Sequence, residues 1–183
     1  MSNFNEIRNI VASINCHPLG GKHKLKSYYN FAAWQLYCLL NNKPKKVKFL
    51  NNTFLMVEKG MAGATGNIYT GLHEFNDMGF LLHFLRKDDL FLDIGANIGS
   101  YSILASGQIG CNTISFEPIP STFNKLKRNI SINNLDDKVK AMQVGVGAKK
   151  GTLTFTSNLD TINHVNLQAK GEASSDSINV DVV

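Results

Sequence analysis

The sequence lacks long hydrophobic runs and paired cysteines, and each absence excludes a class of protein. The longest apolar candidate, residues 31–40, is far too short to cross a bilayer, and residues 1–16 are too polar for a signal peptide. Cys16, Cys38 and Cys111 are scattered without C-x-x-C spacing, so free thiols are expected rather than a disulfide framework or a zinc site. With 183 residues, 43% of them hydrophobic, the chain can form one domain with a core. A cytoplasmic protein without a membrane span is therefore expected.

Acidic residues are almost absent from the first 48 positions. This stretch has eight Lys and Arg residues against Glu6 alone, so it carries a charge of +7, and the net charge of +5 leaves −2 for the rest. Such a region can meet nucleic acid, an anionic glycan or an acidic lipid surface, or it can be a solvated basic face. The solvated face is favoured, because the lysines are not interleaved with the aromatic series that single-strand binders use. No nucleic-acid partner is indicated.

The sequence also lacks a complete metal-binding motif. His73 and Glu74 begin a stretch like HExxH, but position 77 is Asp77 where that motif needs its second histidine. No metal site is expected.

What the sequence does have is the stretch DIGANIGSYS, Asp93 to Ser102, after the apolar residues 90–92. A short apolar run, an acid, two glycines and a further apolar segment predict a strand, a tight turn and a helix that begins near Ser100. Gly95 and Gly99 lack a Cβ, so the backbone can turn sharply and approach a ligand closely. This pattern is typical of a nucleotide-binding loop, although many strand-to-helix turns contain glycines and bind no ligand.

A second acid strengthens that interpretation. Residues 113–116 predict another short strand, which ends at Glu117. In a βαβ unit this carboxylate lies beside the glycine turn and can accept hydrogen bonds from both ribose hydroxyls of a nucleoside. Pro118 favours an extended conformation for Glu117 and so keeps it at the end of the strand. The alternative is an ordinary surface glutamate beside a turn without a ligand.

The first acid indicates which nucleoside. Dinucleotide folds normally show G-x-G-x-x-G, with the pyrophosphate on the helix N-terminus, whereas the spacing here is D-x-G-x-x-x-G. A carboxylate at Asp93 would repel a pyrophosphate but suits a ligand with an ammonium and a sulfonium. S-adenosylmethionine has both, and its adenosine suits Glu117. A nicotinamide-dependent oxidoreductase is the less favoured reading.

The remaining elements complete an α/β pattern. We expect a helix from Ser27, a hairpin over residues 47–57 and a connecting or ligand-covering loop over residues 60–71. Further on we expect a helix capped by Asn76 or Asp77, a helix over residues 121–133, a strand over residues 138–144 and a closing strand over residues 178–183. We place an N-terminal helical and hairpin extension at residues 1–80, and a sheet domain at residues 81–183.

Several of these motifs resemble the FkbM-type S-adenosylmethionine-dependent methyltransferases. DIGANIGSYS, FEPIPSTF at residues 116–123, the Asn-rich helix end at residues 129–133 and VGVGAKKG at residues 144–151 carry the resemblance, and GLHEF at residues 71–75 and NHV at residues 163–165 are similar to a bacterial branch. The resemblance implies a Rossmann-like class I methyltransferase fold and methyl transfer to a hydroxyl of a sugar, glycan or natural product. It implies Gly95, Asn97 and Gly99 around the methionine half of the cofactor and Glu117 on the ribose. It also puts Tyr69 and Glu74 near the cofactor carboxylate or the acceptor, and it assigns no catalytic base.

The resemblance fails at the C-terminal end. Family members continue with a strand carrying a K-I-D-V-E-G-like motif and the second half of the sheet, so we expect a truncated product or fragment with only the first half. Residues 90–94 would then form an exposed hydrophobic sheet edge, through which the chain could oligomerise. We therefore expect this chain alone to bind S-adenosylmethionine weakly and to catalyse little methyl transfer. The other reading is a non-catalytic module that acts on an anionic partner through its basic N-terminal region.

Overall fold

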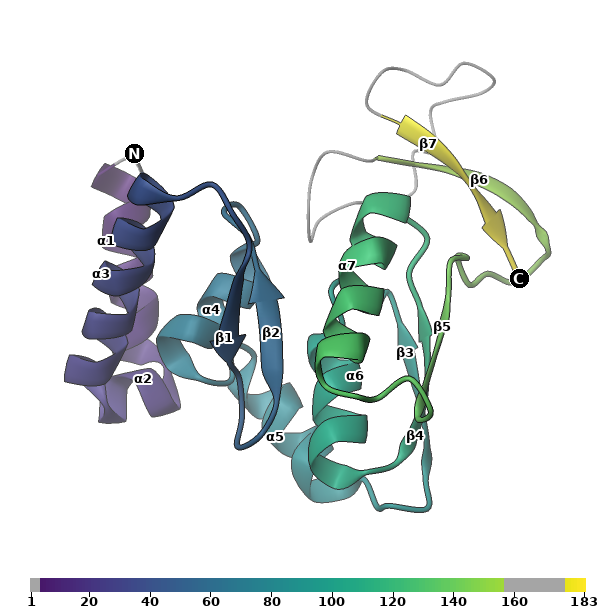
Figure 1. The fold of residues 1–183 in the computed structure, drawn as a ribbon, viewed down its shortest axis with the longest axis horizontal. Helices are drawn as coiled ribbons and strands as arrows, with labels where there is room; N and C mark the ends of the chain where they lie inside the picture. Colours follow the sequence, from purple (N-terminus) through teal and green to yellow (C-terminus); the bar gives the residue numbers. More distant parts are fainter. Residues whose placement is uncertain (1–3, 157–176) are drawn as a thin grey trace.

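A three-stranded parallel sheet organises the computed structural model, which describes residues 4–156 and 177–183 (Figure 1). The strands are β3 (Leu90–Ile94), β4 (Asn112–Phe116) and β5 (Val139–Met142), in the order β3-β4-β5. Their register pairs Asp93 with Ser115 and Thr113 with Val139. Parallel pairing puts the carboxyl ends of the strands at one edge of the sheet, where ligands bind in open α/β folds. The predicted α/β class is confirmed as a partial Rossmann-like fold.

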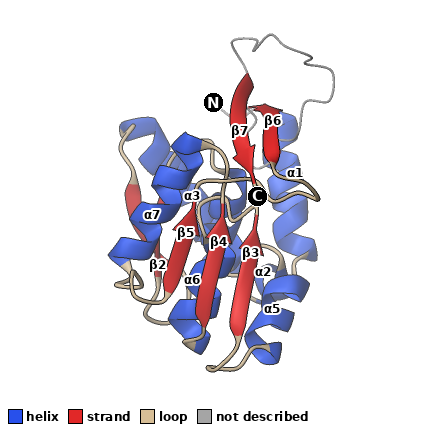
Figure 2. Cartoon of the chain, turned by 90° about the vertical axis from the view of Figure 1, so that its right-hand side faces the viewer, coloured by secondary structure: helices blue, strands red, loops and turns tan. Residues whose placement is uncertain are grey.

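Helices cover one face of this sheet and leave the other open in the part of the chain that the structure describes (Figure 2). The covering elements include α5 (Phe75–Phe84), α6 (Ser100–Leu104) with the π-helical turn η1 (Ala105–Ile109), and α7 (Pro120–Ile132). On the open face Leu90, Leu92 and Ile94 are between 51% and 62% exposed. Among the described strands β3 pairs with β4 alone. The expected exposed hydrophobic edge is therefore present.

The N-terminal extension begins with three helices, α1 (Phe4–Cys16), α2 (Pro18–Lys22) and α3 (Lys24–Leu40). The predicted cap at Ser27 is wrong, because His23 is the N-cap residue and Ser27 is buried within α3. An antiparallel hairpin follows, with β1 (Lys45–Lys48) and β2 (Phe54–Val57). Its turn contains Asn51 with a φ of 45°, a left-handed conformation that asparagine tolerates. The predicted hairpin is confirmed.

The loop expected over residues 60–71 is wrong, since α4 (Ala62–Thr70) fills most of it. Its glycines lower helix propensity, but a helix can be stabilised by packing instead. At Gly66 a Cβ would overlap the His73 ring, so this glycine allows a close approach rather than a turn. The next helix, α5, begins after Glu74 and not after Asn76 or Asp77.

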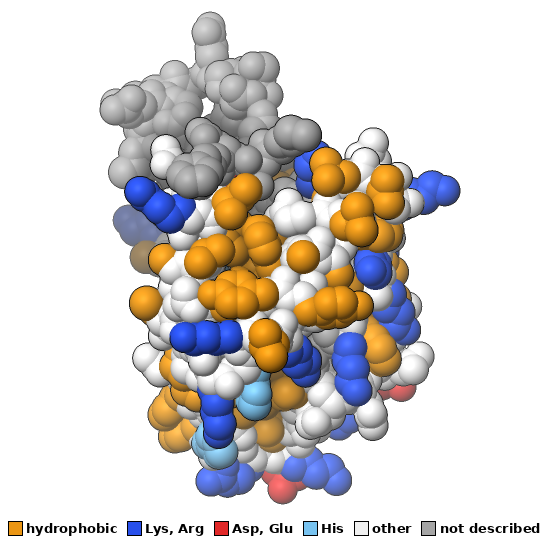
Figure 3. Space-filling view, turned by 90° about the vertical axis from the view of Figure 1, so that its left-hand side faces the viewer, with side chains coloured by type: hydrophobic (Ala, Val, Ile, Leu, Met, Phe, Trp, Pro, Cys, Tyr) orange, Lys and Arg blue, Asp and Glu red, His pale blue; other side chains and the backbone are white. Residues whose placement is uncertain are grey.

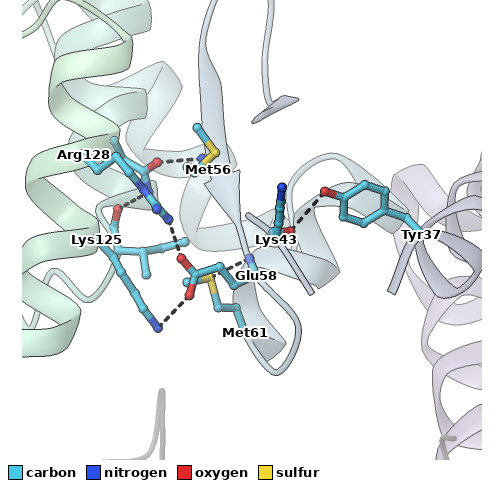
Figure 4. Close-up of polar contacts among 9 residues, drawn as sticks. Tyr37, Lys43, Met56, Glu58, Met61, Lys125 and Arg128 are labelled. Carbon is cyan, nitrogen blue, oxygen red and sulfur yellow. Dashed lines mark hydrogen bonds and ion pairs between the residues drawn. The ribbon is translucent and has the colours of Figure 1, made fainter. Parts of the chain in front are cut away.

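Polar contacts join the hairpin to α7. The fully buried amide of Asn129 accepts from the Met56 N–H at 2.7 Å and donates to the Ile98 carbonyl at 2.8 Å. Glu58, just past β2, pairs with Arg128 at 2.6 Å and Lys125 at 3.6 Å (Figure 4). Burial opposes ionisation of Glu58, but these two cations outweigh it and lower its pKa. Asn129 thus connects the hairpin, α7 and the turn that follows β3.

One buried cluster runs through both parts of the chain. It includes Ile14 of α1, Leu55 of β2, Ile103 of α6 and Leu126 of α7. The boundary expected at residues 80 and 81 falls inside α5. The extension therefore packs on the sheet domain as part of a shared core.

The last described elements are β6 (Gly151–Thr156) and β7 (Ser177–Val182), which pair antiparallel and include the expected closing strand. A single parallel bridge joins Gly145 to Val182. Residues 163–165, the NHV segment, lie outside the described residues. No helix in the described part is long and apolar enough to cross a membrane. Nor do the described residues contain a cluster of three or more metal-ligating side chains.

Candidate functional site

The turn between β3 and α6, residues 95–99, is the glycine elbow at the carboxyl end of the sheet. Gly95, Asn97 and Gly99 have φ values of 78°, 50° and 90°. Position 99 requires glycine for two reasons. Its φ is in the left-handed region, and a Cβ there would lie 2.6 Å from Leu126 Cδ1. At Gly95, by contrast, a Cβ would meet no atom within 4 Å. The elbow is thus packed tightly at Gly99 and open at Gly95.

Every backbone N–H of the elbow donates to an acceptor within the protein. Gly95 and Ala96 both donate to the Phe116 carbonyl at 2.9 Å. Asn97 donates to Glu117, Ile98 to the Asn97 side chain and Gly99 to the Ala96 carbonyl. A pyrophosphate is held at such a turn by free N–H groups. None of these five is free, which argues against a dinucleotide in this position.

Glu117 lies at the end of β4 and is buried against the elbow. One carboxylate oxygen accepts from the Asn97 N–H and the other from the Ile119 N–H, both at 2.9 Å. Burial raises the pKa of Glu117, while these two hydrogen bonds act in the opposite direction. Each oxygen retains a second lone pair, so the carboxylate can shape the elbow and still accept a further hydrogen bond.

Asp93 is buried one residue before the end of β3, at the same end of the sheet as Glu117. Its carboxylate accepts from Ser102 Oγ at 2.5 Å, and Ser102 lies 2.7 Å from Ser115 Oγ. Burial raises the pKa of Asp93 and the Ser102 hydrogen bond opposes that effect. The Asp93 side chain therefore holds α6 through Ser102. It does not line the cavity that lies between the elbow, α4 and the start of α5.

A cavity of about 310 Å³ lies between the elbow, α4 and the start of α5, near the lower end of the usual size range for small-molecule sites. Three of the residues expected at the site line it, namely Glu74, Gly95 and Asn97. The remaining lining residues are Met61, Ala62, Gly63, Ala64, Asn67, His73, Met78, Ala96, Ile98, Ser100 and Tyr101. The structure thus brings together residues from both sides of the 80/81 boundary.

Tyr69 lies elsewhere, on the side of α4 that faces α3. Its ring contacts Phe31 edge-on at 5.3 Å, and its hydroxyl accepts a long hydrogen bond from Gln35 at 3.4 Å. Burial raises the pKa of its phenol. Tyr69 is therefore separated from the cavity by the body of α4.

The charge of the cavity comes from Glu74. Tyr101 Oη donates to the Glu74 carboxylate at 2.8 Å. Burial raises the pKa of Tyr101, and the Glu74 hydrogen bond and charge raise it further. The lining includes one acid and no Lys or Arg. A cationic ligand group is favoured there over an anionic one.

Sequence reasoning missed Tyr101 and Asn67. Asn67 accepts from the His73 N–H at 2.7 Å and lies 3.4 Å from Ser100 Oγ, so it connects α4 to the start of α6. Tyr101 sits inside the DIGANIGSYS stretch, and its place in the first turn of a helix after the elbow was an available signal. No sequence signal indicated Asn67, because its contacts with His73 and Ser100 depend on the helix α4, where a loop was expected.

Comparison with known proteins points to one family. Residues 93–183 match the model described as Methyltransferase FkbM domain. The chain is 32% identical over 83 residues to methyltransferase sdnD of Sordaria araneosa, covering 45% of this chain and 32% of that protein. It is 31% identical over 75 residues to hexuronic acid methyltransferase AglP of Haloferax volcanii, covering 41% of this chain and 30% of the relative.

Among solved structures, P. horikoshii TYW2 in complex with MeSAdo aligns with a TM-score of 0.47 and 20% identity, over 57% of this chain and 37% of that one. The alignments to the curated relatives span about a third of each relative's length. The family match begins at Asp93 and takes in the elbow and Glu117. Through residues 93–183, the chain belongs to the FkbM family of methyltransferases.

Proposed function

We propose that this chain forms the cofactor-binding part of an S-adenosylmethionine-dependent methyltransferase that acts on a hydroxyl oxygen. The single observation that carries the proposal is the cavity beside the elbow, whose lining has one carboxylate and no Lys or Arg. S-adenosylmethionine supplies an electrophilic methyl group on a sulfonium. A cavity with this charge suits its sulfonium and ammonium groups, and the satisfied elbow amides offer nothing to a pyrophosphate.

The residues of the site then take distinct roles. Glu74 faces the ammonium, and the open side of Gly95 and Asn97 gives room for the methionine half. Glu117 does not line the cavity, but it holds the Asn97 amide that does, and its remaining lone pairs are proposed to accept from the ribose hydroxyls. Asp93 and Gly99 position α6 without touching the ligand. Tyr69 belongs in this scheme to the packing between α3 and α4.

For the acceptor we propose a hydroxyl of a sugar, glycan or natural product. Support comes from the relative named as a hexuronic acid methyltransferase. Transfer from a sulfonium needs the acceptor oxygen in line with the methyl group and a base for its proton. No side chain of the described residues is assigned as that base.

Calorimetric titration of the 183-residue chain tests the cofactor. We expect S-adenosylhomocysteine to bind and NADH not to bind. Glu74→Gln removes the one negative charge of the cavity and should weaken binding by roughly tenfold or more, the usual size of a charged hydrogen bond. Asp88→Asn is the control, an exposed acid in the turn before β3 and outside the cavity, and should bind like the parent. Binding of NADH, or equal losses in the two variants, would overturn the proposal.

Methyl transfer is tested separately with labelled S-adenosylmethionine and a panel of uronic acids, neutral sugars and phenols. Incorporation into a hydroxyl supports the enzyme. Cofactor binding without incorporation into any acceptor supports a non-catalytic module instead.

A further inference from the structure

The outward face of α3 is an exposed apolar stripe. Its members Leu25, Tyr29, Leu36, Leu39 and Leu40 are between 57% and 89% exposed. Their spacing follows the helical repeat, so together with the exposed Ala32 they form one continuous strip along the helix. Scattered surface leucines are ordinary, but a strip of this length along one helix marks an interaction surface.

The stripe is not a poorly packed part of the core. Ser27 and Trp34 are the buried residues of α3, and Trp34 stacks on Tyr37 at 5.7 Å on the inward side. Phe31 packs on Tyr69 of α4. The helix therefore already has an inner face that holds it to the protein, and the outer stripe is additional to it.

Lysines border the stripe at both ends. Lys22, Lys24 and Lys26 lie at its N-terminal end and Lys43 follows its C-terminal end, all of them exposed. Lys45 is exposed too, but its ammonium lies 4.6 Å from the centre of the Tyr37 ring and does not belong to this border. Glu6 is the one acid among residues 1–48. Figure 3 shows this side of the molecule, with hydrophobic side chains gathered across it, Lys and Arg among and around them, and Asp or Glu only towards its lower edge.

We propose that α3 is an interfacial helix, which docks this protein on an anionic lipid bilayer surface with the apolar stripe in the headgroup region. A helix of 17 residues is roughly 25 Å long, enough to lie in the plane of the membrane along its whole length. The leucines enter the boundary between headgroups and acyl chains. The flanking lysines keep their ammonium groups at the level of the lipid phosphates.

Charge decides between a bilayer and a second copy of the chain. Two copies packed stripe against stripe would bring two lysine-rich rims together with no acids from residues 7–48 to compensate them. An anionic bilayer offers the opposite charge to the lysines at both ends of the stripe. The proposal concerns binding alone and does not depend on methyl transfer.

Co-sedimentation with large unilamellar vesicles tests the docking. We expect the chain to partition onto vesicles of phosphatidylcholine with 30% phosphatidylglycerol at least tenfold more strongly than onto phosphatidylcholine alone. Leu36→Gln/Leu40→Gln should reduce that partition at least tenfold, and raised salt should weaken it. Leu90→Gln/Leu92→Gln is the matched control, because it changes two leucines on β3 that are also more than half exposed. Circular dichroism of each variant should show an unchanged fold, as expected for exposed side chains.

Three results would overturn the proposal. The first is no partition onto anionic vesicles, and the second is equal partition of the two double variants. The third is a lipid-free dimer in analytical ultracentrifugation that Leu36→Gln/Leu40→Gln dissociates, since this would identify a second copy as the occupant of the stripe.

Discussion

The Glu117 carboxylate accepts a 2.9 Å hydrogen bond from the backbone N–H of Asn97, which lies twenty residues earlier in the chain. This contact links the end of β4 to the elbow that follows β3. It also holds Asn97 in a left-handed conformation. The shape of the cavity wall therefore depends on a buried carboxylate as well as on the glycines.

Replacing Glu117 by glutamine should destabilise the protein by about 2 kcal/mol, because the new NH₂ group would face a backbone N–H where a carboxylate oxygen now accepts. Urea unfolding followed by circular dichroism gives the free energy. Asp137→Asn, at an exposed position, is the control and should change it little. A Glu117→Gln protein as stable as the control would show that the carboxylate is not needed to hold the elbow.

The two elbow glycines should differ in their tolerance of alanine. Gly95→Ala should cost roughly 1–2 kcal/mol, the strain of a left-handed alanine, since its Cβ meets no atom. Gly99→Ala adds an overlap with Leu126 and should cost about 3 kcal/mol or more. The same unfolding measurement compares them. Equal losses would mean that α7 moves freely away from Gly99.

Asn129→Ala should lower the free energy of unfolding by about 3 kcal/mol, because it leaves the Met56 N–H and the Ile98 carbonyl without their partner. Asn124→Ala, on the exposed side of the same helix, should have an effect within about 0.5 kcal/mol. Guanidinium unfolding of both variants checks the difference. Similar values for the two would show that water readily replaces the Asn129 amide.

Asp93 should make the protein less stable as the pH rises. Its pKa is raised on folding, so the folded state binds its proton more tightly and stability falls from about pH 4 upward until the folded carboxyl is ionised. Glu117 contributes in the same direction. Asp93→Asn should therefore reduce this fall between pH 4 and pH 7 without abolishing it.

Urea midpoints at unit steps of pH measure the slope, with Asp136→Asn as the exposed control that should keep the parent slope. A slope in Asp93→Asn as steep as that of the parent would mean that the buried carboxyl does not titrate in this range.

The local pattern was enough for the elbow, the hairpin and the strands. An apolar run, an acid and glycines at residues 90–99 have few alternative conformations, so the strand, turn and helix were confirmed. The exposed face of β3 followed in the same way from an apolar strand without a second neighbour. Failure came at α4, where Gly60, Gly63, Gly66 and Gly71 predict a loop. Packing against α3 and the His73 ring outweighs their weak helix propensity.

The sequence by itself determined the motif at residues 93–102, its family and the second acid at the end of the next strand, because these depend on spacing along the chain. Only the tertiary structure decided that Glu117 accepts from the elbow backbone and that Asp93 binds Ser102 of α6. It also decided that Tyr69 lies on the side of α4 away from the cavity. Those outcomes depend on which side of an element each side chain takes, and on elements up to 79 residues apart that meet only in the folded core. Such contacts are selected by packing, which no local pattern encodes.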